Sequence, residues 1–435
     1  MIKTILHQIW NERRQNGWIF LELVAVTMFL WLAIDPLFVL MSRNNIPRGY
    51  NPDNLYEIVL KQYSPSSIKW KREAANDSVK REAYRNIFEI ARTIPEVEYV
   101  GTSSKGHYPM GGAYSSTYFS IDSTLTADGK EKQFGASFYE ITAEEGDDFL
   151  ATFGLIDAHS GSTAHIVRNE NVNKLYVTRN FAMEGFGTID VVGKKVSSWN
   201  KSEYVICGVL ENVQMMPYSN YIPLVMNVKP SLPNDFSIFI RLKEGVDGKE
   251  FANKFNKDYA PRMAGGNIYC KGVNSHLQSV KEMTEKLGYE NTYRLQVALT
   301  LFALTCAFLG VVSTFWIRAN IRRGDIGVMR SVGASSDSVV RQFVIEALLL
   351  VTAAFCVALP LLLHKVYAMG FATPIVDFVL RTESKSSYMH DVAWMHFAIV
   401  SIITYLIIVS VVMVGVVIPA KRIAVILPSD ALRDE

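Results

Sequence analysis

The chain has 435 residues, of which 49% are hydrophobic and 20% are charged, with a net charge of +2 and four cysteines. These values disfavour a small soluble enzyme, a disordered chain, a disulfide-rich secreted miniprotein and a strongly basic nucleic-acid-binding protein. Four long apolar stretches alternate with segments of ordinary soluble composition. The class that remains is a membrane protein that carries a large aqueous domain.

Residues 1–17 have the pattern of a short amphipathic helix. Ile2, Ile5, Leu6, Ile9 and Trp10 recur at helical spacing and therefore line one face, with basic residues among and after them. The pattern predicts a helix that lies on the cytoplasmic surface of the membrane and anchors the chain there.

The four apolar stretches are each long enough to cross a membrane as a helix. A hydrocarbon core of about 30 Å requires roughly 20 apolar residues at 1.5 Å per residue. The predicted spans are residues 18–41, 295–317, 343–363 and 392–420. The sequence after the first span offers no small-x-small cleavage site, so we expect this span to be an uncleaved anchor.

Acidic residues occur inside two of these spans. Glu22 and Asp35 lie in the first span and Glu346 lies in the third. An acid in the middle of a bilayer is costly, but each of these lies within about 9 Å of a span end. We therefore expect hydration, or pairing with nearby arginines (Arg13, Arg14 or Arg341), in preference to a proton relay.

The distribution of basic residues predicts the topology. Residues 1–17, 318–342 and 421–435 hold 11 Lys and Arg residues, whereas residues 364–391 hold three. By the positive-inside rule, the basic segments are cytoplasmic. Both termini and residues 318–342 are then predicted on the cytoplasmic side, and residues 42–294 and the loop 364–391 outside.

Residues 42–294 are predicted to form a mixed α and β domain of two lobes. Charge and helix formers predict a helix over 68–93, and Phe251–Tyr259 predicts another. Alternating β-branched and aromatic residues predict six strands, at 96–104, 113–121, 133–142, 202–210, 221–227 and 236–242. Residues 264–294, with a polar helix at 280–287, are predicted to be a stalk. The predicted fold is therefore a multi-pass α-helical membrane protein with four transmembrane helices and a large α+β extracytoplasmic domain between the first and second.

No catalytic, cofactor-binding or metal-binding motif is present. Residues 187–195 come closest to a phosphate-binding loop, but the glycine spacing is too long and Lys194 is not followed by Ser or Thr. HExxH, CxxC and GxSxG are absent. Cys207 and Cys270 are predicted outside, where a disulfide between them is possible but weakly supported. We therefore expect this chain not to be an enzyme and not to hydrolyse ATP by itself.

The second span carries small residues three or four positions apart. These are Ala303, Ala307, Gly310 and Thr314, together with Ser313. Small residues at this spacing allow two helices to approach closely in lipid. The partner helix is equally well one of the same subunit or the matching helix of a second subunit in a dimer.

Residues 318–342 are too regularly patterned for a simple connector. Ile321, Val328, Met329 and Val332 form an apolar stripe on a predicted short helix. Gly333 is suited to end that helix, and Ser335 to cap the next one. From periodicity alone, the stripe is expected to lie on the membrane surface.

Two motifs resemble a known family. Residues 323–335 read RGDIGVMRSVGAS and are followed by Phe343 and Glu346. This run resembles the signature R-x-E-I-G-x-x-R-A-x-G-A-S … F … E of MacB/FtsX-type ABC transporter permeases, with Asp325 and Ser331 where Glu and Ala are usual. The tail, PAKRIA at 419–424 and LPSDALR at 427–433, resembles the family's closing P-A-x-R-A-x … P-x-x-A-L-R. The external block is loosely similar to the MacB-like periplasmic domain.

The resemblance implies a permease subunit of the bacterial inner membrane, with its large domain periplasmic or extracellular. It further implies a dimer with a second copy or a paralogous permease, and a separate ABC ATPase that binds ATP and Mg²⁺. Membrane lipids, and a periplasmic adaptor or substrate protein, are further expected partners; nucleic acid is not. We call residues 318–342 the coupling segment, because the resemblance implies that it contacts the ATPase through Arg322, Arg323, Ile326, Gly327, Val328, Met329, Arg330, Val332, Gly333 and Ala334.

ATP-driven closure of the dimer would then move the external lobes and export or extract a substrate such as a peptide, drug or lipoprotein. Two alternatives remain. One is an FtsX-like signalling subunit that regulates a cell-wall hydrolase, and the other is a membrane receptor without an ATPase partner.

Overall fold

The structure is a computed structural model that describes residues 11, 13–111, 115–125, 131–144, 146–167, 173–229, 236–370 and 388–424. The predicted helix at 1–17, the predicted loop at 364–391 and the second part of the closing motif, at 427–433, therefore lie largely or wholly outside the described residues. The chain divides into two compact units, one of residues 1–43 with 290–435 and one of residues 44–289. Each unit is described by itself.

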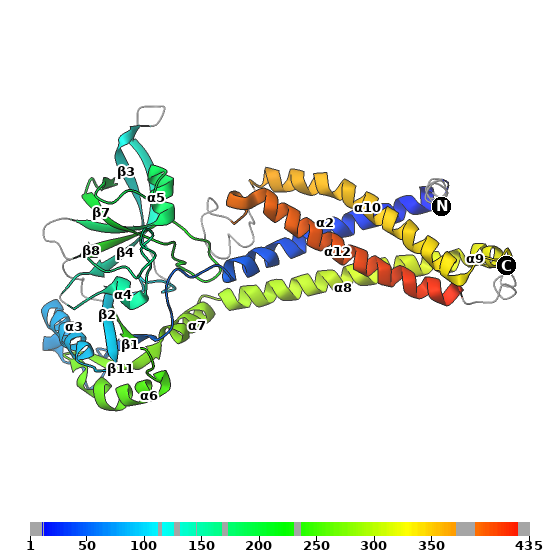
Figure 1. Cartoon of the computed structure of the whole chain (residues 1–435). Coiled ribbons are helices and arrows are strands. Elements are labelled where there is room, and N and C mark those ends of the chain that lie inside the picture. Colours follow the sequence, from blue (N-terminus) through cyan, green and yellow to red (C-terminus); the bar gives the residue numbers. More distant parts are fainter. Residues whose placement is uncertain are drawn as a thin grey trace. The chain divides into compact units, whose positions relative to one another are not determined.

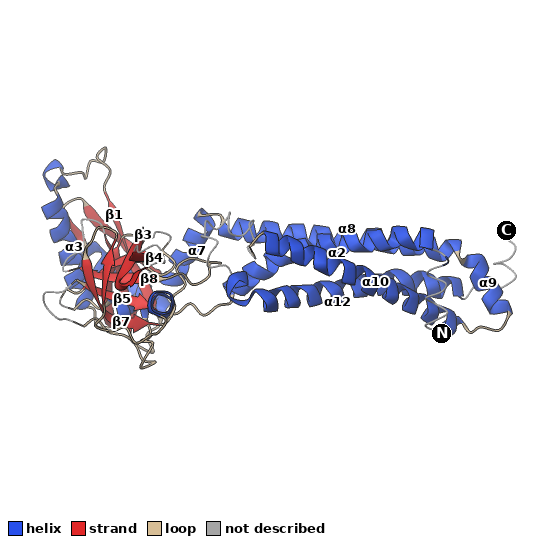
Figure 2. Cartoon of the chain, turned by 90° about the horizontal axis from the view of Figure 1, so that it is seen from above, coloured by secondary structure: helices blue, strands red, loops and turns tan. Residues whose placement is uncertain are grey.

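The first unit consists of long apolar helices. They are α2 (Arg13–Asn44), α8 (Tyr289–Ile321), α10 (Ser336–Ala368) and α12 (Tyr388–Ala424), with the short α9 (Arg323–Ser331) between α8 and α10. Four segments, at 16–44, 289–321, 336–368 and 392–422, are long and apolar enough to cross a membrane. Figures 1 and 2 show the four long helices side by side. The prediction of four membrane-spanning helices is confirmed.

Polar contacts inside this bundle join helices that are distant in the sequence. The buried Asp35 on α2 lies 2.7 Å from Nε2 of the fully buried His396 on α12, and Trp31 donates a hydrogen bond to Ser401 at 3.1 Å. Glu22 accepts a hydrogen bond from Thr314 at 2.9 Å. Buried polar groups in an apolar bundle need such partners. The contacts shown for Asp35 and Glu22 are therefore to neighbouring helices, rather than to the N-terminal arginines that the sequence suggested.

The second unit is built on one sheet of 11 strands in the order β10-β11-β1-β9-β2-β4-β3-β6-β7-β5-β8. The strands are β1 (Leu55–Gln62), β2 (Val97–Ser104), β3 (Ser115–Leu125), β4 (Glu131–Thr142), β5 (Lys174–Thr178), β6 (Lys195–Ser198), β7 (Glu203–Leu210), β8 (Leu224–Lys229), β9 (Phe236–Leu242), β10 (Ala264–Gly265) and β11 (Ile268–Ser275). The helices are α3 (Asp77–Arg92), α4 (Phe149–Phe153), α5 (Arg179–Phe186), α6 (Gly248–Lys254) and α7 (His276–Lys286).

The sheet forms two lobes. In the first, β10, β11, β1, β9 and β2 enclose a core with α3 and α6 that includes Ile87, Ile240 and Phe255. In the second, β8 pairs with β5 and also with β4, which closes β4, β3, β6, β7, β5 and β8 into a ring. The core of this ring includes Phe119 and Phe181. A closed ring leaves no free sheet edge among its six strands, which protects against edge-to-edge association.

The six predicted strands are all present, with ends shifted by up to a few residues. Five further strands, β1, β5, β6, β10 and β11, were not predicted. Residues 264–275, which the sequence suggested as part of a stalk, are instead strands β10 and β11 of the sheet. These strands are short or carry charged residues, so their alternation of apolar and polar side chains is weak.

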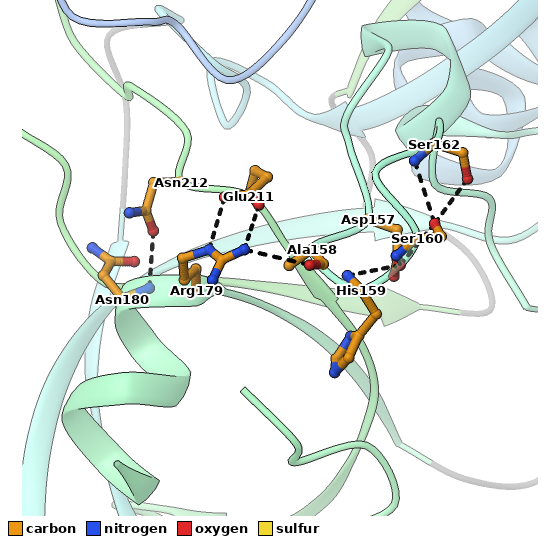
Figure 3. A network of polar contacts seen from close by, with 9 residues as sticks. All are labelled: Asp157, Ala158, His159, Ser160, Ser162, Arg179, Asn180, Glu211 and Asn212. Carbon is orange, nitrogen blue, oxygen red and sulfur yellow. Dashed lines mark hydrogen bonds and ion pairs between the residues drawn. The ribbon is translucent and has the colours of Figure 1, made fainter. Parts of the chain in front are cut away.

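A cluster of polar contacts joins the ends of two parallel strands in the second lobe (Figure 3). Arg179, which follows β5, donates two hydrogen bonds to Glu211, which follows β7, at 2.9 and 2.6 Å. The backbone N–H of Asn180 donates to the side chain of Asn212 at 2.9 Å. Two parallel hydrogen bonds between an arginine and a carboxylate fix the relative orientation of the two side chains as well as their distance. The cluster therefore holds the start of α5 against the end of β7.

Candidate functional site

The coupling segment forms a helix and a tight turn between α8 and α10. Backbone angles at Arg322 and Val332 are not helical, and these residues bound α9. Gly333 follows with φ of +100°, a conformation that glycine adopts without strain. Ser335 then caps α10 by accepting a hydrogen bond from the N–H of Ser338 at 3.2 Å. The predicted helix ending at Gly333 and the predicted cap at Ser335 are confirmed.

A buried ionic triad anchors this segment to α10. Glu346 accepts hydrogen bonds from Arg318 and, at 2.7 Å, from Arg322. The side chains of all three are at most 9% exposed. The guanidinium of Arg322 also lies 5.5 Å from the centre of the Phe343 ring, within the range of a cation–π contact. The end of α8 and the start of α10 are thereby held together on either side of α9.

The triad corrects two expectations. The partners of Glu346 are Arg318 and Arg322 rather than Arg341. Arg322, which the family resemblance placed at the ATPase-contacting surface, is 6% exposed and points into the bundle. The signal in the sequence is the spacing of Arg318 and Arg322, since residues four apart on a helix share a face. From that spacing, both arginines could have been predicted to pair with Glu346 in the next span.

The other predicted coupling residues divide between a buried side and an exposed side of α9 and its turn. Ile326 and Gly327 are buried, and Ile326 packs in the core of the helical bundle. Val328 is 52% exposed and Val332 is 84% exposed. We call these two residues the exposed valine pair. Gly333 is also exposed, whereas the partly buried members are Arg323, Met329, Arg330 and Ala334.

Fewer of the predicted coupling residues are therefore exposed enough to contact an ATPase than the sequence suggested. Arg330 donates a hydrogen bond to Ser336 across the turn. That contact ties the last turn of α9 to the first turn of α10. The side chains of the exposed valine pair remain available to a partner, and burying such apolar surface is the main source of affinity in many contacts.

The small residues of α8 pack within the chain. Ala303 and Ala307 are 2% and 4% exposed and belong to the same core as Leu23 and Leu30 of α2. Thr314 donates to Glu22 of α2, and a Cβ on Gly310 would lie 3.6 Å from a carboxylate oxygen of Glu22. In the described structure, this face therefore contacts α2 of the same subunit. The dimer-packing role of these four residues stays a prediction.

Among its described residues, the external unit carries no comparable group of chemically active side chains. Among the described residues, no three His, Cys, Asp or Glu side chains come together as metal ligands. Cys207 on β7 and Cys270 on β11 are both free thiols on strands that are not neighbours. Burial raises the pKa of Cys270 to about 11, which makes this thiol unreactive at neutral pH.

One buried acid stands out in this unit. Asp147, 1% exposed, accepts hydrogen bonds from the hydroxyls of Thr102 and Thr142, which lie on β2 and β4. The backbone N–H of Thr102 also donates to it, at 3.1 Å. Burial raises the pKa of Asp147 to about 7 despite these hydrogen bonds. The group joins two strands at the boundary of the lobes and has the character of a structural contact.

Residues 297–428 match the model of the FtsX-like permease C-terminal family. The match contains most of α8 and all of α9 and α10, and with them the triad and the exposed valine pair. This part of the chain is an FtsX-like permease domain. The chain is a multi-pass membrane protein with a mixed α and β domain between its first and second spans.

Curated relatives of this permease are macrolide export ATP-binding/permease proteins. MacB of Escherichia coli strain K12 is 27% identical over 262 residues, which cover 57% of this chain and 36% of that protein. MacB 1 of Yersinia pseudotuberculosis is 29% identical over 170 residues, which cover 37% of this chain and 25% of that protein. The alignments thus span about a quarter to a third of the relatives' length.

Two solved structures are similar to the permease over about half of its length. The periplasmic region of MacB from Actinobacillus actinomycetemcomitans has 11% identity and a TM-score of 0.33, covering 56% of this chain and 98% of that one. The extracellular domain of the noncanonic ABC-type transporter YknZ from Gram-positive bacteria has 14% identity and a TM-score of 0.30, covering 50% of this chain and 99% of that one.

Proposed function

We propose that this permease binds a separate ABC ATPase through the exposed valine pair, and that ATP binding and hydrolysis in that partner move the external unit. ATP and Mg²⁺ would be held by the partner, with none bound by this chain. The movement would export or extract a substrate such as a peptide, a drug or a lipoprotein. The relatives' names, which join an ATP-binding part to a permease part, support this assignment.

The observation that carries the proposal is the arrangement of α9. Val328 and Val332 present apolar surface to solvent, while Ile326 on the other side is buried in the bundle. The triad holds together the two helices that flank α9. A displacement of α9 would therefore move α8 and α10 as well, with little local bending between them. Transfer of movement from a cytoplasmic partner requires an apolar surface that the partner can bind and a rigid connection from that surface to the membrane helices.

The topology proposal follows from charge. With the coupling segment and both termini in the cytoplasm, the external unit lies in the periplasm or outside the cell, and the membrane is the bacterial inner membrane. This places the exposed valine pair on the side where ATP is available.

A dimer, with a second copy or a paralogous permease, would contact the outward side of α8. Leu295, Leu299, Phe302 and Leu309 are between 51% and 65% exposed there. Lipid tails also cover such surface, so apolar exposure alone does not select a protein partner. Gly310, which is exposed, lies close to this side and would permit a close approach at its edge.

The test is a charge on the valine pair. In membranes that contain the assembled transporter, we expect Val328→Asp with Val332→Asp to lower the permease-dependent ATPase rate at least tenfold, because an unpaired carboxylate would be buried in the contact. Val192→Asp is the matched control, since Val192 is 57% exposed on the external unit. Unchanged ATPase activity in the double variant, at equal permease level, would remove these residues from the contact.

A further inference from the structure

The loop between β1 and α3 combines positive charge with exposed apolar surface. From Lys61 to Arg72 the sequence is KQYSPSSIKWKR, with four basic residues and no acidic one. Residues 73–92, which follow the loop and contain α3, hold four acidic and four basic residues, so the excess of positive charge is confined to the loop. We call residues 61–72 the basic loop; it leads into α3 in Figure 1.

The side chains of the basic loop point outward. Ile68 is 101% exposed, so its side chain touches almost nothing in the protein. The four basic residues, Lys61, Lys69, Lys71 and Arg72, are exposed as well, and Trp70 is partly buried. A single exposed apolar residue is common on protein surfaces, but one that is fully exposed and followed directly by Lys69, Trp70 and Lys71 is a specific combination.

The loop is held in this shape by contacts at its base. Tyr63 stacks on Tyr269 of β11 with ring centres 4.5 Å apart, and the amine of Lys69 lies 5.6 Å from the Tyr63 ring. The side chain of the buried Asn267 accepts a hydrogen bond from the backbone N–H of Lys71 and donates one to its carbonyl, both at 2.8 Å. Ile68 is therefore displayed by a loop that is fixed on both sides, so little conformational entropy is lost when it binds.

We propose that the basic loop binds an anionic lipid surface. The lysines and Arg72 would attract the negatively charged headgroups, and Ile68 with the edge of Trp70 would enter the boundary between headgroups and acyl chains. An acidic polymer in water would satisfy the charges but would offer Ile68 no apolar environment. The exposure of Ile68 therefore favours lipid over a soluble polyanion.

The test uses the full chain in nanodiscs of neutral phosphatidylcholine and measures their capture by large vesicles. Vesicles containing 30% phosphatidylglycerol are compared with vesicles of phosphatidylcholine alone. We expect capture by the anionic vesicles only, and weakening as salt is raised. Lys69→Gln with Lys71→Gln should reduce the capture constant about 30-fold, roughly fivefold for each charge. Ile68→Ser should reduce it about tenfold.

Matched variants control for charge and apolarity elsewhere on the same unit. Lys249→Gln with Lys257→Gln removes two other exposed lysines, and Val192→Ser removes another exposed apolar side chain. Both should leave capture unchanged. Equal losses in the basic-loop and control variants would overturn the proposal, since net charge alone would then account for binding. Capture that needs the lysines but not Ile68, together with equal binding to soluble polyglutamate, would also overturn it in favour of an acidic polymer.

Discussion

At the scale of single residues, Glu346 has two buried arginines as partners. We therefore expect its substitution to lower the stability of the permease strongly. Glu346→Ala would remove the buried carboxylate that both Arg318 and Arg322 contact. Breaking a buried ion pair from one side costs about 3–5 kcal/mol. We expect a clear fall in the thermal midpoint of the purified permease and a loss of its stimulation of the ATPase.

Two variants separate the ionic contact from general damage to α10. Asp337→Ala removes an exposed acid from the first turn of the same helix and should have little effect. Replacing the whole triad (Arg318→Met, Arg322→Met and Glu346→Met) should recover much of the stability, because its three charges are then removed together. A triple variant less stable than Glu346→Ala would contradict this account of the triad.

Asp147 gives a pH prediction at the same scale. Its pKa is about 7 in the folded protein against an ordinary value of 3.8, so the folded state holds the proton more tightly than the unfolded state. The stability that this group contributes is complete below about pH 4, declines as the pH rises toward 7, and is lost above that. Asp147→Asn should remove this decline, which thermal unfolding between pH 4 and 8 would measure. A decline of unchanged size in the variant would assign the pH dependence to other groups.

At the scale of elements, the segment that enters the external unit depends on one glycine. Gly49 has φ of +73°, and a Cβ there would overlap the carbonyl oxygen of Asn212. The neighbouring carbonyl of Arg48 accepts a hydrogen bond from the N–H of Gln214 at 2.9 Å, so this approach is fixed. Gly161 has a similar φ of +68° with open space around it.

Gly49→Ala should therefore destabilise the external unit more than Gly161→Ala does. Both variants strain the backbone by about 1–2 kcal/mol, but only the first adds a steric clash. Thermal unfolding of the two variants side by side measures the difference. Equal losses would show that the approach of residues 48–49 to residues 212–214 can relax without cost.

Element positions could be predicted where the pattern of residues is local. The spans follow from length and apolarity, and Phe236–Leu242 was predicted with its observed ends, because its apolar residues form an unbroken strand-like run between turn residues. Strands β1 and β11 were not predicted because charged residues within them, such as Lys61 and Lys271, weaken the apolar pattern expected of a strand. Their pairing with each other, between residues more than 200 positions apart, leaves no local signal.

The candidate site could be predicted only in part, for the same reason. The apolar stripe of the coupling segment and its capping residues are local features. Which side of that helix is buried depends on the packing of α9 against α10 and α12, which the sequence does not specify. For this reason the sequence grouped the buried Ile326 and Arg322 with the exposed Val328 and Val332.

At the scale of the whole molecule, the chain combines a helical unit, which carries the exposed valine pair at α9, with a two-lobed external unit. The closure of the second lobe into a ring makes that lobe suited to move as one body, because its strands have no free edge to rearrange. The basic loop is on the other lobe. Under the proposed function, movement would begin at α9 and reach the substrate through the external unit.

The most direct test places a photoreactive amino acid at Val332 in cells that express the complete transporter, with Val192 as the matched exposed position. We expect irradiation at Val332, and not at Val192, to yield a crosslinked product in which mass spectrometry finds peptides of a protein with a Walker nucleotide-binding motif. If instead position 332 crosslinks only to lipid or to external proteins, the exposed valine pair does not contact an ATPase and the central claim is wrong.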